Sequence, residues 1–211
     1  MSLMQVIASS RPRGGGGGGV TFVSTGPVSV NTNVTLPTGL ANGDILVAFI
    51  TNITPADIKL PTGWTRAKTD YTWTTYAYAT MVAYHVVTNA GSEPSNLAFD
   101  NGGGANRSGV IVNYRGSSGL VAAGNFSQTG STAMGVSAVV GTGLLLSMVS
   151  QLQIGTNNSI SAPSGMTGRI DSASGGFFHI GIADLAANDA ASKAFSVSAN
   201  AYSAVTISLV L

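Results

Sequence analysis

Two histidines, His85 and His179, are the only side chains in this 211-residue chain whose ordinary pKa lies near neutral pH. Each stands inside a short run of alternating apolar residues, "MVAYHVV" and "FFHIGIADL", which is typical of a β-strand. Neither has a second histidine at the spacing that metal ligation needs, and the chain has no cysteine. We therefore expect both histidines to be structural, and we predict no catalytic residue and no metal site.

The carboxylates do not define an acid–base pair. Glycoside hydrolysis needs two carboxylates on either side of a cleft, but the seven Asp and one Glu are scattered, mostly through predicted loops. The stretch "DNGGGANRSG" offers calcium oxygen ligands at Asp100, Asn101 and Asn106, yet its single carboxylate favours a plain hairpin loop. Neither this stretch nor "RPRGGGGGG" has the Gly-Lys-Ser/Thr ending of a phosphate-binding loop. We therefore predict a protein that is not an enzyme and that needs no cofactor.

Charge is scarce in this sequence. Only 8% of the residues are charged and the formal net charge is +1, whereas ordinary soluble domains are about 25% charged. No basic patch indicates nucleic acid, and no apolar run approaches the length of about 20 residues that crosses a membrane as a helix. We expect neither as a partner. Weak charge instead permits close self-association, because little repulsion opposes it.

Short runs rich in Val, Ile, Thr and aromatic residues recur along the chain, separated by Gly, Pro, Asn and Ser. Runs of this length and spacing predict an antiparallel β-sandwich or barrel; they include "VTFVS", "DILVAFIT", "GVIVNYR", "LLLSMVS" and "AVTISLVL". The only helical competitor is the Ala-rich segment "ADLAANDAASKAF" from Ala183. We predict an all-β fold.

The order of the elements repeats along the chain. "GDILVAF" from Gly43 is echoed by "TGLLLSM" from Thr142, and each half closes on a last strand, "SGVIVNYRG" and "SAVTISLVL". Two copies are too few for a solenoid. We predict one sandwich over residues 21–211, built from two related halves at about 21–120 and 121–211, with the sheets packed face to face.

A proline–glycine turn recurs at equivalent places in the two halves, in "LPTGWTRAKTD" and "APSGMTGRIDS". Proline presets φ for a turn, and Gly63 and Gly165 supply positive φ. The turn places Trp64 and Met166 at matching positions. An exposed tryptophan can stack on a sugar, but the methionine at the matching position favours a packing role for both.

Residues 1–20 lie outside the repeated unit. Six consecutive glycines follow two arginines here, and a segment of this composition is a flexible coil. An apolar tip on such a coil can lay a strand against the edge of a neighbour's sheet. We therefore expect residues 1–20 to be a flexible arm that binds a partner; the alternative is a terminus without a binding role. The predicted partner-binding residues are Leu3, Met4, Val6, Ile7, Arg11 and Arg13.

Aromatic residues are dense in the stretch "YTWTTYAYAT". A break near the two central threonines would gather them in one loop. Aromatic faces in such a loop can bind sugar, or they can cap the end of the sandwich. Both interpretations stay open for Tyr71, Trp73, Tyr76 and Tyr78.

The segments "GDILVAFIT", "PTGWTRAKTD", "MVAYHVVTNAGSEPSNLAF" and "GVIVNYRG" make residues 20–211 similar to a diffuse family of β-sandwich proteins. These proteins are encoded largely in tailed-bacteriophage genomes and prophages. The family pattern is a Gly-Asp before the first long strand, a Pro-x-Gly-Trp turn and a Tyr-Arg-Gly at the mid-chain join. In this chain the pattern falls on Gly43-Asp44, on residues 61–64 and on Tyr114-Arg115-Gly116.

The resemblance implies a jelly-roll-like sandwich on the virion surface, assembled in the host cytoplasm, without catalytic residues. We expect a capsid decoration (cement) protein that stabilises the head and whose arm anchors it to the major capsid protein or to another virion subunit. A homotrimer would be the natural symmetry at threefold positions. The alternative is a tail-fibre or head-fibre module that recognises host surface glycans through Tyr71, Trp73, Tyr76 and Tyr78.

Overall fold

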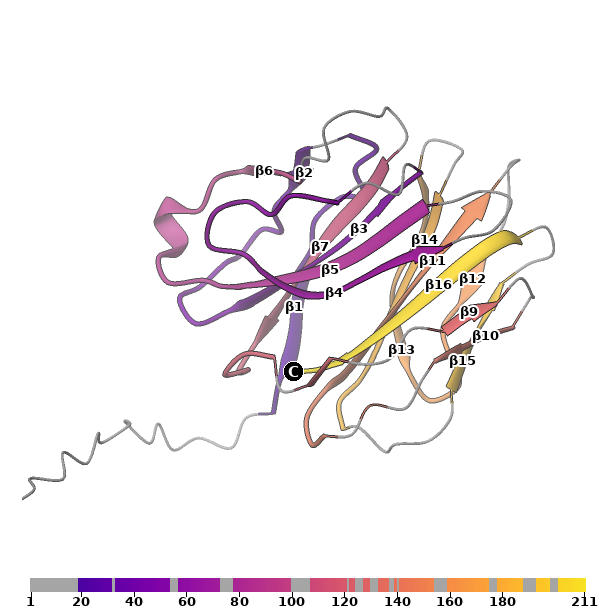
Figure 1. The fold of residues 1–211 in the computed structure, drawn as a ribbon. Coiled ribbons are helices and arrows are strands. Elements are labelled where there is room, and N and C mark those ends of the chain that lie inside the picture. The colour runs from indigo at the N-terminus through magenta and orange to yellow at the C-terminus, as the bar shows by residue number, and fades with distance from the viewer. Residues whose placement is uncertain are drawn as a thin grey trace, which may run out of the picture.

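A computed structural model describes the fold of residues 19–31, 33–53, 57–72, 78–99, 107–120, 122–123, 127–129, 133–136, 139, 141–153, 159–174, 178–187, 193–197 and 201–211. Within these ranges the chain is all-β apart from one 3-10 turn, η1 (Ala90–Ser92), and the strands pair antiparallel. Two main sheets pack face to face, one from the indigo-to-magenta half of the chain and one from the orange-to-yellow half (Figure 1).

The first half of the chain forms a five-stranded sheet. Its order is β1 (Thr21–Thr25), β7 (Arg107–Arg115), β3 (Ile45–Asn52), β5 (Tyr78–Val86) and β4 (Thr65–Thr72). All eight residues of the central strand β3 are buried, since one face meets the second sheet and the other is covered from outside.

The second half repeats this order. Its sheet runs from β13 (Thr167–Ser174) through β14 (Phe178–Leu185), β11 (Leu145–Gln153) and β16 (Ala201–Val210) to an edge made by β8 (Ala122–Ala123) and β9 (Ser127–Thr129). The predicted antiparallel β-sandwich of two related halves is therefore confirmed. The likeness to a jelly roll is limited to the two-sheet architecture, because each half keeps its long strands in one sheet.

The sequence echo matches the structural register at the central strands. Val47 pairs with Val112, Leu146 pairs with Leu209, and all four face the space between the sheets. The last strands of the two halves, β7 and β16, are offset by two residues from the alignment of their sequences. The sequence alignment matches Val112 with Ile207, whereas the structural register matches Val112 with Leu209. A shift of two residues preserves the face of every side chain, so the core is unchanged.

The recurring proline–glycine turn has the same geometry in both halves. The amide of Trp64 donates to the carbonyl of Pro61 over 3.2 Å, and the amide of Met166 donates to the carbonyl of Pro163 over 3.0 Å. The glycines between them have φ of +84° and +80°. Trp64 is only 8% exposed and stacks edge-on against Phe99, which confirms its packing role.

Small sheets cover the outer faces. β2 (Asn33–Thr35) pairs with β6 (Asn96–Ala98) over the first sheet. β10 (Ala133–Val136), β15 (Lys193–Val197) and β12 (Ile160–Ser161) cover the second sheet, with β15 in the middle. The second half thus has a three-stranded cover where the described part of the first half has two strands.

Glycines in the main strands let these covers approach closely. A Cβ atom on Gly109 in β7 would lie 2.8 Å from the Val34 side chain in β2. A Cβ atom on Gly181 in β14 would lie 2.5 Å from the Ile160 side chain in β12. Each cover therefore rests on a strand that lacks a side chain at the point of contact.

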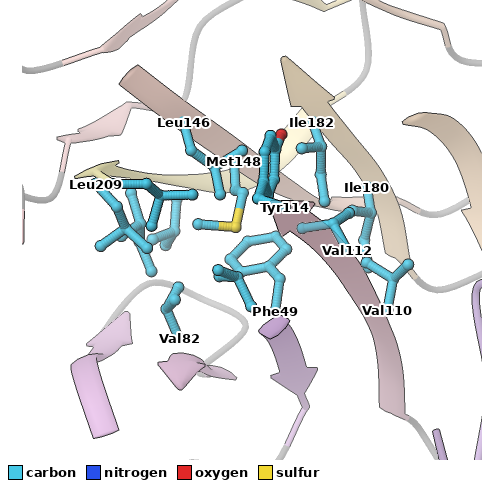
Figure 2. Packing of buried hydrophobic residues seen from close by; sticks show 14 of the residues in the cluster. Phe49, Val82, Val110, Val112, Tyr114, Leu146, Met148, Ile180, Ile182 and Leu209 are labelled. Atoms are coloured by element: carbon cyan, nitrogen blue, oxygen red, sulfur yellow. The ribbon is translucent and has the colours of Figure 1, made fainter. Parts of the chain in front are cut away.

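The main core lies between the sheets and takes side chains from both halves (Figure 2). Alternation along each strand turns every second residue toward it. Its largest members come from β3, β7, β11 and β14, and they include Phe49, Tyr114, Met148 and Phe178. Burial of these side chains stabilises the face-to-face packing of the two halves.

Candidate functional site

The predicted arm residues Leu3, Met4, Val6, Ile7, Arg11 and Arg13 lie outside the described residues. The described chain begins at Gly19 and enters β1 at Thr21. Among the described strands, β1 pairs only with β7, so it forms one edge of the first sheet. The segment that precedes β1 therefore joins the sandwich at a sheet edge.

The predicted aromatic cluster falls on the β4–β5 hairpin. Tyr71 and Tyr78 stand near the ends of these two strands, where Thr72 pairs with Tyr78. The hairpin thus brings their backbones to one end of the first sheet. Trp73 and Tyr76 lie outside the described residues, as do the side chains of Tyr71 and Tyr78.

His85 is held in a structural cluster, as its place in a strand predicts. Its Nδ1 lies 2.9 Å from the Gly63 carbonyl, its Nε2 lies 2.9 Å from the Glu93 carboxylate, and its ring stacks on Trp64 at 5.6 Å. Each ring nitrogen thus lies within hydrogen-bond distance of an oxygen atom. The cluster joins β5 to the turn before β4 and to the segment after η1.

His179 occupies the outer face of the second sheet. Its Nε2 contacts the Asp171 carboxylate, which also accepts the backbone amide of Ile160 over 3.1 Å. His179 is 3% exposed, and its Nδ1 has no hydrogen-bond partner among the described residues. The histidine and the aspartate tie β13 and β14 to the covering strand β12, which is again a structural arrangement.

The Gly-Asp and Tyr-Arg-Gly motifs meet in space. The buried Asp44 carboxylate accepts from Arg115 over 2.7 and 2.8 Å, from Asn113 over 2.9 Å and from the amide of Ala41 over 2.9 Å. Burial alone would raise the pKa of Asp44, but these hydrogen bonds and the Arg115 charge outweigh it and hold the pKa below its usual value. The motifs therefore fasten the start of β3 to the end of β7.

A second buried carboxylate connects the two sheets. Asp184 in β14 accepts from the Tyr114 hydroxyl in β7 over 2.8 Å and from Arg169 in β13 over 2.7 and 3.0 Å. The Arg169 guanidinium also lies 4.4 Å from the centre of the Phe22 ring in β1. Burial, followed by the charge of Asp184, raises the pKa of Tyr114 well above its ordinary value, so the phenol stays protonated and donates.

These contacts decide what the polar groups can do. Asp44, Asp184, His85 and His179 each form hydrogen bonds that join strands to one another or to the segments beside them. Among the described residues, no group of three or more His, Asp or Glu side chains lies close enough to hold a metal ion.

Two hollows lie on the surface of the described part. One of 220 Å³ lies beside the β-bulge of β13 and is lined by Ile160, Ala162, Asp171 and Phe195, among others. The other, of 490 Å³, lies between residues 35–40 and residues 90–95 of the first half. The second is the larger and the more apolar of the two.

Comparison with known proteins identifies no relative. No family model matches the chain, and no match was found among curated proteins or among solved structures. No helix in the described ranges has the length and apolarity to cross a membrane.

The sequence reasoning missed the Tyr114–Asp184–Arg169 network, although one signal was present. In "FHIGIADL", Asp184 continues the alternation of Phe178, Ile180 and Ile182, so a carboxylate was placed on the core face. A charged group in that position needs a buried partner. The identity of that partner was not readable, because Tyr114 is 70 residues away.

Proposed function

We propose that this chain is a non-enzymatic structural protein of a phage virion, a decoration protein that binds the outer head shell and stabilises it. Residues 1–20 are the anchor, and the sandwich is the part that projects. The observation that carries the proposal is the position of β1: the N-terminal segment joins the fold at a sheet edge, from which it can extend to a neighbouring subunit.

Two further properties support an assembly role. The polar groups described above hold strands together, which gives a rigid projecting body. A chain with 8% charged residues and a net charge of +1 offers little repulsion to neighbours. Binding through apolar burial and strand pairing is weakly screened by salt. The partners are the major capsid protein or another virion subunit, and a homotrimer fits a threefold position.

The test is a head-binding assay with the purified protein. We expect a chain that lacks residues 1–19 to keep its cooperative unfolding transition. We expect the same chain to remain in the supernatant when the heads are sedimented, because it no longer binds them. The full chain with Leu3→Asp and Ile7→Asp should behave in the same way, because charge replaces the apolar tip. Arg11→Gln is the milder control and should weaken binding less. Unchanged head binding by the truncated chain would contradict the anchor role.

A second candidate function is recognition of host surface glycans. The β4–β5 hairpin supports it, because the strand ends bring Tyr71 and Tyr78 to one end of the sheet, with Trp73 and Tyr76 in the connecting segment. Trp73→Ala should then abolish binding on a glycan array and reduce host adsorption. Trp64→Phe is the matched control, because Trp64 is buried. Absence of glycan binding by the unaltered chain, with normal adsorption of the Trp73→Ala phage, would contradict this function.

A further inference from the structure

The 490 Å³ groove in the first half is shaped to receive an apolar segment. Leu36 and Pro37 are buried among its lining residues, and Leu40 and Ala90 are half-buried. Glu93 is the one charged residue among the described residues that line it, and its carboxylate also contacts Nε2 of His85 over 2.9 Å. A hollow with buried apolar residues and one acidic group fits an apolar peptide that is followed by basic residues.

The groove lies beside the strand through which the N-terminal segment enters the fold. The Ser24 hydroxyl in β1 donates to the carbonyl of Thr38 over 2.6 Å, and Thr38 lines the groove. Arg115, which pairs with Thr21, donates to the carbonyl of Gly39 over 3.1 Å, and Gly39 lines it as well. Ser24 lies four residue steps after Val20, which is about 13 Å at ~3.3 Å per residue.

We propose that this groove binds the apolar tip of the chain's own N-terminal segment, residues 3–7, while the subunit is free. The tip supplies Leu3, Met4, Val6 and Ile7. The only charged side chains in residues 1–20 are Arg11 and Arg13, which are opposite in sign to Glu93. Occupant and groove therefore match in polarity, and the arginines would add to the contact that the Glu93 carboxylate already makes with His85.

The length of the linker favours binding within one chain. Residues 8–19 join Ile7 to Val20 and include six glycines and two serines. A twelve-residue linker of this composition has a root-mean-square span of about 19 Å, which exceeds the length of about 13 Å along β1 from Val20 to Ser24, the residue that contacts the groove. A short flexible linker of this kind gives an effective concentration on the order of millimolar. The chain's own tip thus outcompetes a second copy at micromolar protein.

The inference concerns the free subunit and does not depend on what the arm binds in an assembly. Binding in the groove would shield the apolar tip from water before assembly. Shielding lowers the tendency of free subunits to associate through their tips. If the tip did not bind the groove, the head-binding proposal would be unaffected, since head binding is measured in a separate assay. Loss of head binding by the truncated chain would likewise say nothing of where the tip rests in the free subunit.

The chain has no cysteine, so two introduced cysteines report on one contact without interference. The test pair is Val6→Cys with Thr38→Cys, and the control pair is Val6→Cys with Ser164→Cys. Thr38 and Ser164 are both exposed and lie in Pro-Thr-Gly and Pro-Ser-Gly turns whose glycines have φ of +76° and +80°. The control site lies five residues before Arg169, whose guanidinium contacts Phe22 in β1.

We expect a short bismaleimide reagent to join the test pair at least tenfold faster than the control pair, in full-length protein at micromolar concentration. The product should migrate as a monomer under denaturing conditions, with the mass of one chain plus one linker. Adding Leu3→Asp and Ile7→Asp should remove the rate advantage, and an unchanged unfolding transition would show that these variants still fold. Equal rates for the two pairs would overturn the proposal. A dimeric product whose rate rises with protein concentration would assign the groove to a second copy, and would also overturn it.

Discussion

The two halves of this molecule share a backbone plan but differ in the chemistry placed on it. Both sheets have the same strand order, and both carry a β-bulge at the same place, Ala67 in β4 and Arg169 in β13. At other equivalent positions the residues diverge. Asp44 precedes β3 where Gly143 precedes β11, and Tyr84 stands where Asp184 stands in the second half.

This difference shows which residues specify the fold and which were free to change. The turn glycines and the inward-facing apolar positions recur in both halves, because each sheet needs them to form and to face its partner. The ionic contacts do not recur. Asp44 with Arg115 fastens strands within the first sheet, whereas Asp184 joins the second sheet to Tyr114 of the first. The hydrogen bond between the sheets therefore takes one residue from each half and adds to the apolar core that they share.

The largest expected effect follows from breaking that joint contact. Asp184→Asn removes the buried charge that Arg169 faces, and we expect a loss of about 3 kcal/mol in the free energy of unfolding, measured with urea. Tyr114→Phe removes only one hydrogen bond and should cost about 1–2 kcal/mol. Asp57→Asn is the control, since its ion pair with Arg66 is exposed and should contribute under about 1 kcal/mol. Equal losses for Asp184→Asn and Asp57→Asn would contradict a special role for the inter-sheet contact.

The covering sheets can be tested in both halves at once. Gly109→Ala and Gly181→Ala place a methyl group within 2.8 Å and 2.5 Å of the covering side chains. We expect each to lower the free energy of unfolding by about 1–3 kcal/mol, because the covers must shift. Gly168→Ala is the matched control, since its Cβ atom would lie at an ordinary 3.5 Å from Ala162. If Gly168→Ala cost as much as Gly181→Ala, close approach of the cover would not be the cause.

The recurring turn should respond equally in the two halves. Gly63→Ala and Gly165→Ala have space for the methyl group, but both force a non-glycine residue to positive φ. We expect each to reduce the free energy of unfolding by about 1–2 kcal/mol. Gly91→Ala, which needs no positive φ, should have little effect in the same thermal or urea measurement. A large difference between the two turn variants would break the equivalence of the halves.

The smallest effect is a pH dependence that arises at Asp44, in the first half. The pKa of Asp44 is below its usual value in the folded chain, so the unfolded chain binds more protons as the pH falls below about 4. The stabilisation from Asp44 is therefore present above that pH and is lost as the pH drops through the folded pKa. We expect the unfolding free energy of Asp44→Asn to depend less on pH between about 5 and 3 than that of the unaltered chain. Identical slopes for the two proteins would contradict this role of Asp44.

Much of the fold was readable from the sequence because the information is local. Short alternating runs and turn residues predict strands, and the predicted echo of "GDILVAF" in "TGLLLSM" falls on the central strands of the two sheets. The proline–glycine turns were also predicted, since their chemistry is confined to a few residues. The two-residue offset of the last strands was missed, because an alternating pattern looks the same after a shift of two.

The hydrogen bonds between the sheets and the surface groove could not be predicted from the sequence. The inter-sheet network joins Tyr114 to residues 55 and 70 positions away, and no local pattern encodes such a distance. The 490 Å³ groove is formed by two loops that meet only after β2 pairs with β6. Its relation to the N-terminal segment depends on β1, which lies beside Thr38 only in the folded sheet.

The measurement that tests the central claim most directly is immunogold electron microscopy, with antibody raised against residues 21–211 and applied to particles from the producing culture. Decoration of the head shell predicts gold distributed evenly over the heads, with the label lost from particles of a phage whose chain carries Leu3→Asp and Ile7→Asp. Gold confined to the tail tip, or particles without any label, would contradict it.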